Sequence, residues 1–330
     1  MKYILGLDQG ASKTHAVIID ELGNVKGFGT GGGANHAVNG IDFAMDQVED
    51  AFTQAITEAG LTKDDIDEIG AGITGIDWDY ETELVSNAIR DRLKIERIIA
   101  VNDCIIAMRG GTSGTVSAII CAGSGLNCAV RDGDRLYTYG YYIPPHCGGS
   151  GALGAAAIQA VLDSEAGLIG PTALTGALLD FFGLPTVDDL MRFRETGKIS
   201  FSEHIVKVVR ILGDVAAAGD PVAMEIWKES ARSMAGLIIR RAEIMGITDK
   251  AIEVVVSGGV FKTKYKGFDE TVREEILKGI PNATVTEAIY EPVIGAALLA
   301  FDHLYNNHVP DSVYRNLNLS AEKYPVKRIG

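Results

Sequence analysis

The sequence predicts an α/β fold in which one unit occurs twice, with mixed sheets flanked by helices. Residues 3–20, YILGLDQGASKTHAVIID, contain an apolar strand, a polar turn with a glycine, and a second apolar strand. Residues 115–130, TVSAIICAGSGLNCAV, repeat that order. A tight turn and a further extended run follow each copy. These observations favour a duplicated fold with two similar α/β domains.

The first turn has the side chains expected of an anion site. Gly10 lets the backbone approach a ligand closely, and the hydroxyls of Ser12 and Thr14 can donate hydrogen bonds. Lys13 supplies a positive charge beside them. Asp8 is a carboxylate next to this turn, which makes sense mainly if Mg²⁺ bridges it to a phosphate, because Mg²⁺ prefers oxygen ligands.

The second turn has the same character, with Gly123, Ser124, Gly125 and Asn127 between its strands. Taken alone, either turn also matches an ordinary hairpin, and it is the repetition that favours a function.

Composition narrows the class of protein. The chain has 330 residues, of which 47% are hydrophobic, so we expect about two domains with substantial cores. No uninterrupted run of about 18 apolar residues occurs, and we expect neither a membrane span nor a targeting segment. A net charge of −14 argues against a nucleic-acid partner. The four cysteines lack C-x-x-C spacing, which favours free thiols and a cytoplasmic location.

The rest of the first half reads as alternating elements. We expect helices at residues 39–60 and 81–93 and strands at 67–76 and 97–101. The last strand ends at Asp103, where open α/β sheets place ligands, so Asp103 is the candidate general base. An aspartate at this point is equally compatible with a simple helix N-cap.

The second half contains a long helical stretch. Helices are expected at residues 154–163, 174–183, 187–195, 202–218 and 221–245, which form a helical insertion at about 155–248. A strand at 251–256 then runs into Gly258 and Gly259, where a planar ring or a phosphate can lie against bare backbone. We expect a strand at 284–288 and an apolar helix at 293–305. The predicted domains are therefore 1–110 and 111–305, and the tail at 306–330 could pack on the first.

Four segments, LGLDQGASKT, CAGSGLN, VVVSGGVF and EPVIGAA, resemble the actin-like ATPase superfamily, which includes sugar kinases. Within it the chain is similar to the BadF/BadG/BcrA/BcrD ATPase family, on its N-acetylglucosamine kinase-like side. The resemblance extends over nearly the whole chain. It implies two ribonuclease H-like domains with ATP and Mg²⁺ in the cleft between them, and a small-molecule sugar or amino sugar as phosphate acceptor.

The resemblance also implies a role for individual residues. Asp103 would be the catalytic base, and Asp8 would lie near the metal. The residues expected to contact ATP are Ser12, Lys13 and Thr14 at the terminal phosphates, Gly123, Ser124 and Gly125 in the second loop, and Gly258 and Gly259 at the adenosine. The residues expected to contact the sugar are Asn35, Thr74 and Asn127, with Ser150 close by.

The sequence departs from the family pattern at two places. Gln9 or Ala11 stands where a third glycine is usual, which should change the first turn slightly. Ser150 replaces a tryptophan, and Ala155 and Ala156 stand where an acidic pair is expected. A sugar hydroxyl left without its carboxylate would cost about 1–3 kcal/mol, so N-acetylglucosamine itself is disfavoured as the acceptor.

Three functions are compatible with these residues. The leading hypothesis is an ATP-dependent kinase of a sugar or amino sugar, and the resemblance makes a homodimer plausible. The second is an ATPase that activates an acyl-CoA reductase or dehydratase through an interfacial iron–sulfur cluster, for which Cys147 is the cysteine in a suitable loop. The third is a protein that binds sugar or nucleotide without catalysis.

Overall fold

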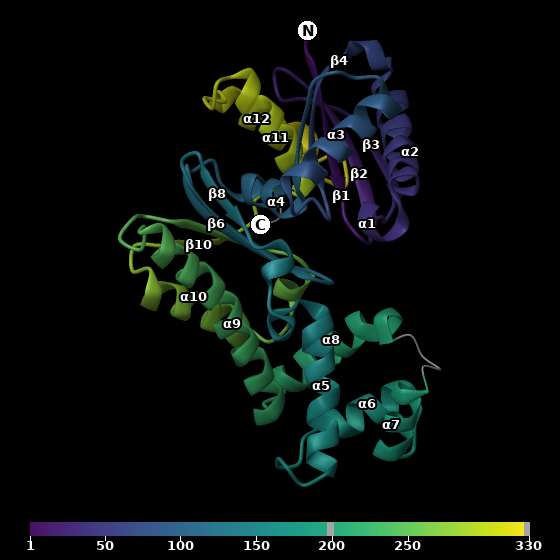
Figure 1. Cartoon of the computed structure of the whole chain (residues 1–330), viewed down its shortest axis with the longest axis vertical. Helices are drawn as coiled ribbons and strands as arrows, with labels where there is room; N and C mark the ends of the chain where they lie inside the picture. Colours follow the sequence, from purple (N-terminus) through teal and green to yellow (C-terminus); the bar gives the residue numbers. More distant parts are fainter. Residues whose placement is uncertain (197–200, 327–330) are drawn as a thin grey trace.

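The computed structural model describes residues 1–196 and 201–326, with only the backbone at 201–203. Within these residues, two five-stranded sheets form the centres of two lobes, one above the other in Figure 1. The first sheet has the order β3-β2-β1-β4-β5 and the second the order β8-β7-β6-β9-β10. In both sheets the first three strands of this order are antiparallel and the last two run parallel. The predicted duplicated α/β fold is confirmed.

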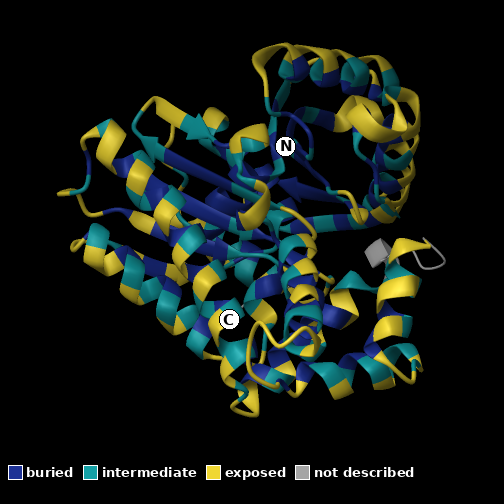
Figure 2. Ribbon diagram, turned by 60° about the horizontal axis from the view of Figure 1, so that its bottom comes forward, coloured by how far each residue is buried: buried dark blue, intermediate teal, exposed yellow. Residues whose placement is uncertain are grey.

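The strands of the first sheet are β1 (Tyr3–Gln9), β2 (Lys13–Asp20), β3 (Val25–Gly32), β4 (Ile66–Ile73) and β5 (Ile98–Asn102). Those of the second are β6 (Val116–Ala122), β7 (Leu126–Asp132), β8 (Arg135–Thr138), β9 (Glu253–Ser257) and β10 (Thr284–Glu287). The central strands are buried on both faces between helices, and Figure 2 shows them in dark blue.

The helices that accompany the first sheet are α1 (His36–Asn39), α2 (Ile41–Ala59), α3 (Asp79–Leu93), α4 (Asp103–Gly111), α11 (Pro292–Leu304) and α12 (Asp311–Ala321). Those of the second lobe are α5 (Ser150–Glu165), α6 (Leu174–Phe182), α7 (Val187–Glu195), α8 (Phe201–Ala217), α9 (Pro221–Met245) and α10 (Gly267–Gly279). One-turn 3₁₀ helices lie at Lys63–Asp65, Gly140–Tyr142, Pro145–Cys147 and Gly259–Lys262.

The long helical stretch forms an outer part of the second lobe. Figure 1 shows α6 and α7 at the end of this lobe that is farthest from the first lobe. Helix α9 has the bounds that the sequence predicts, with Asp220 accepting from the amide of Ala223 as its N-cap. Helix α5 begins four residues before its predicted start, at Ser150. Helix α10 was not predicted.

The C-terminal helices return to the first lobe. Helix α11 packs across β1 and β4, where a Cβ atom on Gly70 would overlap the carbonyl oxygen of Ala296. Helix α12, which the sequence left unassigned, buries Val313 and Leu317 against the same core as Ile4. The last helices of the chain therefore lie with the first sheet, although the predicted boundaries place α11 in the second domain. The division at residue 110 remains a proposal, and residues 327–330 of the tail lie outside the described chain.

Candidate active site

The first turn is the tight connection between β1 and β2. The amide of Gly10 donates to the carbonyl of Lys13 at 2.9 Å, so Ala11 and Ser12 form the tip of the turn. Ser12 and Lys13 are exposed there. The turn is also tied to β4, because the amide of Thr74 donates to the carbonyl of Gln9 at 2.8 Å.

Two side chains near this turn point into the protein and away from the cleft. Thr14 is fully buried, and its hydroxyl donates to the carbonyl of Gly32 at 2.7 Å. Thr14 therefore supports the sheet and does not line the cleft, whereas the sequence predicts it at the terminal phosphates. Gln9 is also fully buried and donates to the carbonyl of Ala44 at 2.8 Å.

The second turn joins β6 to β7 and lies against the start of α5. The amide of Gly123 donates to the carbonyl of Gly125 at 2.9 Å, which leaves Ser124 and Gly125 exposed. The backbone amide and hydroxyl of Ser150 both donate to the carbonyl of Gly123 at 2.9 Å. A Cβ atom on Gly149 would overlap the carbonyl of Gly125. This close packing directs the positive N-terminal end of α5 towards the second turn.

The two glycines after β9 have different positions. Gly258 has φ +103°, and a Cβ atom on it would overlap the carbonyl of Ala122 in β6. Glycine is needed here because the backbone after β9 lies so close to β6, and Gly258 does not line the cleft. Gly259 lines the cleft and also an adjoining cavity of about 330 Å³, whose wall includes the basic residues Arg210, Lys262 and Lys264.

One cleft of about 700 Å³ between the lobes brings most of the predicted residues together. Its lining includes Asp8, Gly10, Ser12, Lys13, Asn35, Thr74, Asp103, Gly123, Ser124, Gly125, Asn127 and Gly259. Thr14, Ser150 and Gly258 are the predicted site residues that do not line it. The first and second turns therefore face the same space.

Asp103 is the first residue of α4, at the carboxyl end of β5. The N-cap of that helix is Asn102, whose Oδ1 accepts from the amide of Cys104 at 3.0 Å. Asp103 is therefore not the N-cap of α4, which was the alternative to a catalytic role. Burial raises the pKa of Asp103 to about 6, with a further contribution from the Asp77 carboxylate.

Asp8 lies in β1 and is 7% exposed. Burial is the largest cause that raises its pKa to about 7, and the carboxylates of Asp103 and Glu291 raise it further. Lys13 acts in the opposite direction. Asp8 is thus a buried carboxyl whose ionised form is disfavoured by two acidic neighbours, and a bound divalent cation would stabilise that form.

Asp77, which the sequence analysis missed, belongs to a polar network that connects the lobes. Asn102 donates to Asp77 Oδ1 at 3.0 Å, and Asn127 of the second lobe donates to Asn102 Oδ1 at 3.1 Å. The amide of Gly140 completes the network by donating to Asn127 Oδ1 at 3.0 Å. Asp77 follows the carboxyl end of a parallel strand, β4, so the rule that selected Asp103 would also have selected it. Tyr141 is a second missed lining residue, and no motif marked it.

Ala155 and Ala156 do not line the cleft. They face two other cavities along α5, of about 440 and 600 Å³. Ser150 is 7% exposed and bonded to the second turn, so it supports this turn where the sequence analysis expected it near the sugar.

The duplicated sheets and the cleft between two glycine turns define the fold as the duplicated actin-like, ribonuclease H-like type. The chain belongs to the BadF/BadG/BcrA/BcrD ATPase family, whose model matches residues 5–300.

Three curated relatives match this chain over most of their own length. The chain is 26% identical to the N-acetylmuramic acid/N-acetylglucosamine kinase of Clostridium acetobutylicum, over 91% of this chain and 98% of that protein. It is 25% identical to the N-acetyl-D-glucosamine kinase of Dictyostelium discoideum, over 90% and 97%. It is 27% identical to the glucosamine kinase GspK of Vibrio cholerae, over 72% and 80%.

Solved structures support the fold. A Chromobacterium violaceum protein with a provisional N-acetylglucosamine kinase name superposes with a TM-score of 0.69 at 19% identity, over 91% of this chain and 99% of that one. A ROK family glucokinase from Streptomyces griseus, solved with glucose and AMPPNP, gives 0.57 at 19% identity, over 90% and 98%.

Two other expectations concern the cysteines and the membrane. All four cysteines are free, and Cys147 is 4% exposed, so its thiol is not available at the surface to bind an interfacial cluster. Among residues 1–196 and 201–326, no helix combines the length and apolar character needed to cross a bilayer.

Proposed function

We propose that this protein is an ATP-dependent kinase that phosphorylates a hydroxyl group of a sugar or amino sugar. The observation that carries the proposal is that both glycine turns and Asp103 line a single cleft between the lobes. The relatives that match over most of their length are kinases of N-acetylglucosamine, N-acetylmuramic acid or glucosamine.

The phosphates of ATP would lie between the two turns. Ser12 and Lys13 offer a hydroxyl and an ammonium group from the first lobe, and the exposed backbone of Ser124 and Gly125 offers amides from the second. The N-terminal end of α5 adds a favourable dipole behind the second turn. The adenosine would extend past Gly259 into the adjoining cavity of about 330 Å³.

Asp8 is the residue that would hold a magnesium ion. A buried carboxylate with two acidic neighbours is costly when ionised, and a cation removes that cost. Mg²⁺ would neutralise phosphate charge during transfer and keep several of its waters.

Asp103 would accept the proton of the acceptor hydroxyl. The acceptor oxygen then bonds to the terminal phosphorus as the bond to ADP breaks. Asn102 positions the base by capping α4, and the Asp103 carboxylate accepts hydrogen bonds from the Thr74 side chain and the Cys104 backbone. The other polar groups of the cleft, Asn35, Thr74, Asp77 and Asn127, would bind the remaining sugar hydroxyls.

The sharpest test of the proposal compares the wild-type protein with Asp103→Asn. We expect ATP consumption with at least one member of a panel containing glucosamine, N-acetylglucosamine, N-acetylmuramic acid and glucose. Loss of the general base should lower kcat by about 10²–10⁴-fold, while ATP binding, measured by calorimetry, stays within about twofold. Near-normal turnover by the variant would show that another group is the base.

Two competing functions are outcomes of the same measurements. ATP binding without sugar-dependent ADP release would favour a binding protein. An absorbance shoulder at about 400 nm in anaerobically purified protein would favour the iron–sulfur activator. We also propose a cytoplasmic homodimer, and sedimentation velocity would test the dimer.

A further inference from the structure

Exposed aromatic side chains gather at the edge of the cleft, and the reaction proposed above does not use them. In the first lobe, Trp78 ends the connection between β4 and α3, and Tyr80 is the second residue of α3. In the second lobe, Tyr141 lies in the 3₁₀ helix after β8. Their exposed fractions are 45%, 63% and 62%. The ring centroid of Trp78 lies 5.8 Å from that of Tyr141 and 6.3 Å from that of Tyr80. We call these three residues the mouth cluster.

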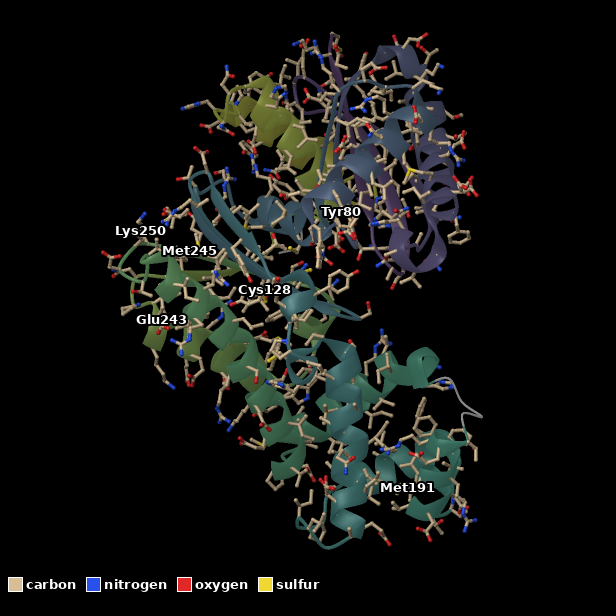
Figure 3. All side chains as sticks on the ribbon, viewed as in Figure 1. Tyr80, Cys128, Met191, Glu243, Met245 and Lys250 are labelled. Atoms are coloured by element: carbon tan, nitrogen blue, oxygen red, sulfur yellow. The ribbon has the colours of Figure 1, made fainter. Side chains whose placement is uncertain are left out.

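The mouth cluster is continuous with the cleft. Tyr141 lines the cleft directly, and Trp78 follows Asp77, which also lines it. Tyr80 lies where the first lobe faces the second (Figure 3). Because Asp77 bonds to Asn102, the residue before the proposed base, the cluster adjoins the end of the cleft where the acceptor would bind.

The turn that carries Trp78 is held in place before any ligand binds. Glu81 accepts hydrogen bonds from the backbone amides of Asp77 and Trp78 at 2.8 and 3.0 Å. The hydroxyl of Tyr80 donates to the same carboxylate at 3.3 Å. A fixed aromatic surface loses little conformational entropy on binding, which favours a real subsite.

The geometry of the rings suits the face of a sugar. The contacts within the cluster are edge-to-face, with interplanar angles of 62°, and all three residues keep much of their surface exposed. The C–H face of a pyranose ring gains from apolar burial and from weak C–H contacts on such a surface. Hydroxyl and carboxylate groups at the rim can bind the equatorial oxygens of the ring.

We propose that the mouth cluster is a subsite for a second sugar ring, so that the acceptor is a disaccharide or a longer glycoside whose terminal ring reaches Asp103. This inference rests on the proposed sugar-kinase function. The second ring would contact Trp78 of one lobe and Tyr141 of the other, and would thereby favour the closed arrangement of the lobes.

The kinetic test compares glucosamine and N-acetylglucosamine with their β-1,4-linked dimers. We expect the dimer to have the higher kcat/KM in the wild-type protein. Trp78→Ala and Tyr141→Ala should each lower kcat/KM for the dimer about tenfold or more, while the value for the monosaccharide changes less than about twofold. Tyr142→Ala is the matched control, because Tyr142 is 74% exposed beside Tyr141 but does not line the cleft. Equal losses for both acceptors, or a preference for the monosaccharide, would overturn the subsite.

A binding measurement keeps this test separate from that of the kinase function. The chain has two tryptophans, and Trp227 is fully buried, so changes in solvent-sensitive emission report mainly on Trp78. The dimer should shift this emission and the monosaccharide should not, and Trp78→Phe should abolish the shift. An emission shift with the dimer, without phosphorylation of any sugar, would support the subsite and contradict the proposed kinase function. Phosphorylation without any emission shift would contradict the subsite. The mouth cluster would then be assigned to a protein partner.

Discussion

At the scale of single residues, the free-energy cost of burying a charge sets the pKa values of the carboxyl groups in the cleft. The pKa values of Asp8 and Asp103 are raised to about 7 and about 6, chiefly because burial disfavours their ionised forms. Asp77 is the second cause of the rise at Asp103, and burial and the carboxylate of Glu81 raise the pKa of Asp77 itself. The pKa of the proposed base, Asp103, thus lies close to neutral pH, which suits a general base.

These shifts predict the acidic limb of the pH profile. A raised pKa keeps Asp103 protonated to a higher pH, and a protonated carboxyl cannot accept a proton, so kcat/KM should fall as pH drops through about 6. Asp77→Asn removes a neighbouring negative charge and should move this limb to lower pH. The measurement is kcat/KM between pH 4.5 and 8 for both proteins. An unchanged limb would mean that Asp77 does not act on the base.

At the scale of elements, close packing of helix on sheet decides where glycine is required. Helix α11 crosses β4 so closely that a Cβ atom on Gly70 would overlap the carbonyl of Ala296. The sequence shows a glycine in an apolar strand, which indicates close backbone approach without naming the partner.

Two glycine substitutions should have opposite effects on stability. Gly70→Ala forces α11 away from the sheet and should lower the free energy of unfolding by about 1–3 kcal/mol or more. Gly236→Ala, in the middle of α9 with no atom within 4 Å of the added Cβ, should raise it by up to about 1 kcal/mol because alanine favours helix. Urea denaturation of both variants measures this, and equal effects would contradict the packing argument.

At the scale of the whole molecule, α4 is the helix between the lobes. It begins at Asp103 and contacts β4 and β5 of the first sheet and β6 and β7 of the second. Its far end is anchored by Arg109, which is 7% exposed and pairs with both carboxylate oxygens of Asp302 in α11, at 2.6 and 2.9 Å. The guanidinium also donates to the hydroxyl of Tyr314 in α12 at 2.8 Å.

Removing the Arg109 side chain should lower the free energy of unfolding of the protein. Arg109→Ala leaves the Asp302 carboxylate, which is 18% exposed, without its cation, and we expect a loss of about 3 kcal/mol in unfolding free energy. Arg135→Ala breaks an ion pair in which the arginine is 59% exposed, and should cost less than about 1 kcal/mol. Thermal and urea unfolding distinguish the two, and a small loss for both would show that Arg109 is not an anchor.

Sequence reasoning reached some residues of the site and not others, for physical reasons. Asp103 and the two turns could be found because strand ends and glycine turns are local patterns. Thr14 could not be separated from Ser12, because the strand pairing of β2 with β3 decides which hydroxyl enters the sheet. Tyr141 joins the cleft only because the segment after β8 meets the first lobe.

By itself, the sequence determined the strand–turn–strand repeats, the helical insertion, the family and the candidate base, because hydrophobic periodicity and turn chemistry act over a few neighbouring residues. Only the tertiary structure decided which side chains share the cleft, since Asp77 meets Asn102 between neighbouring strand ends and Asn127 meets Asn102 across the lobes. It also decided that Asn102 caps α4 while Asp103 faces the cleft, and that α11 and α12 complete the first lobe. Such outcomes depend on long-range packing, which no local pattern encodes.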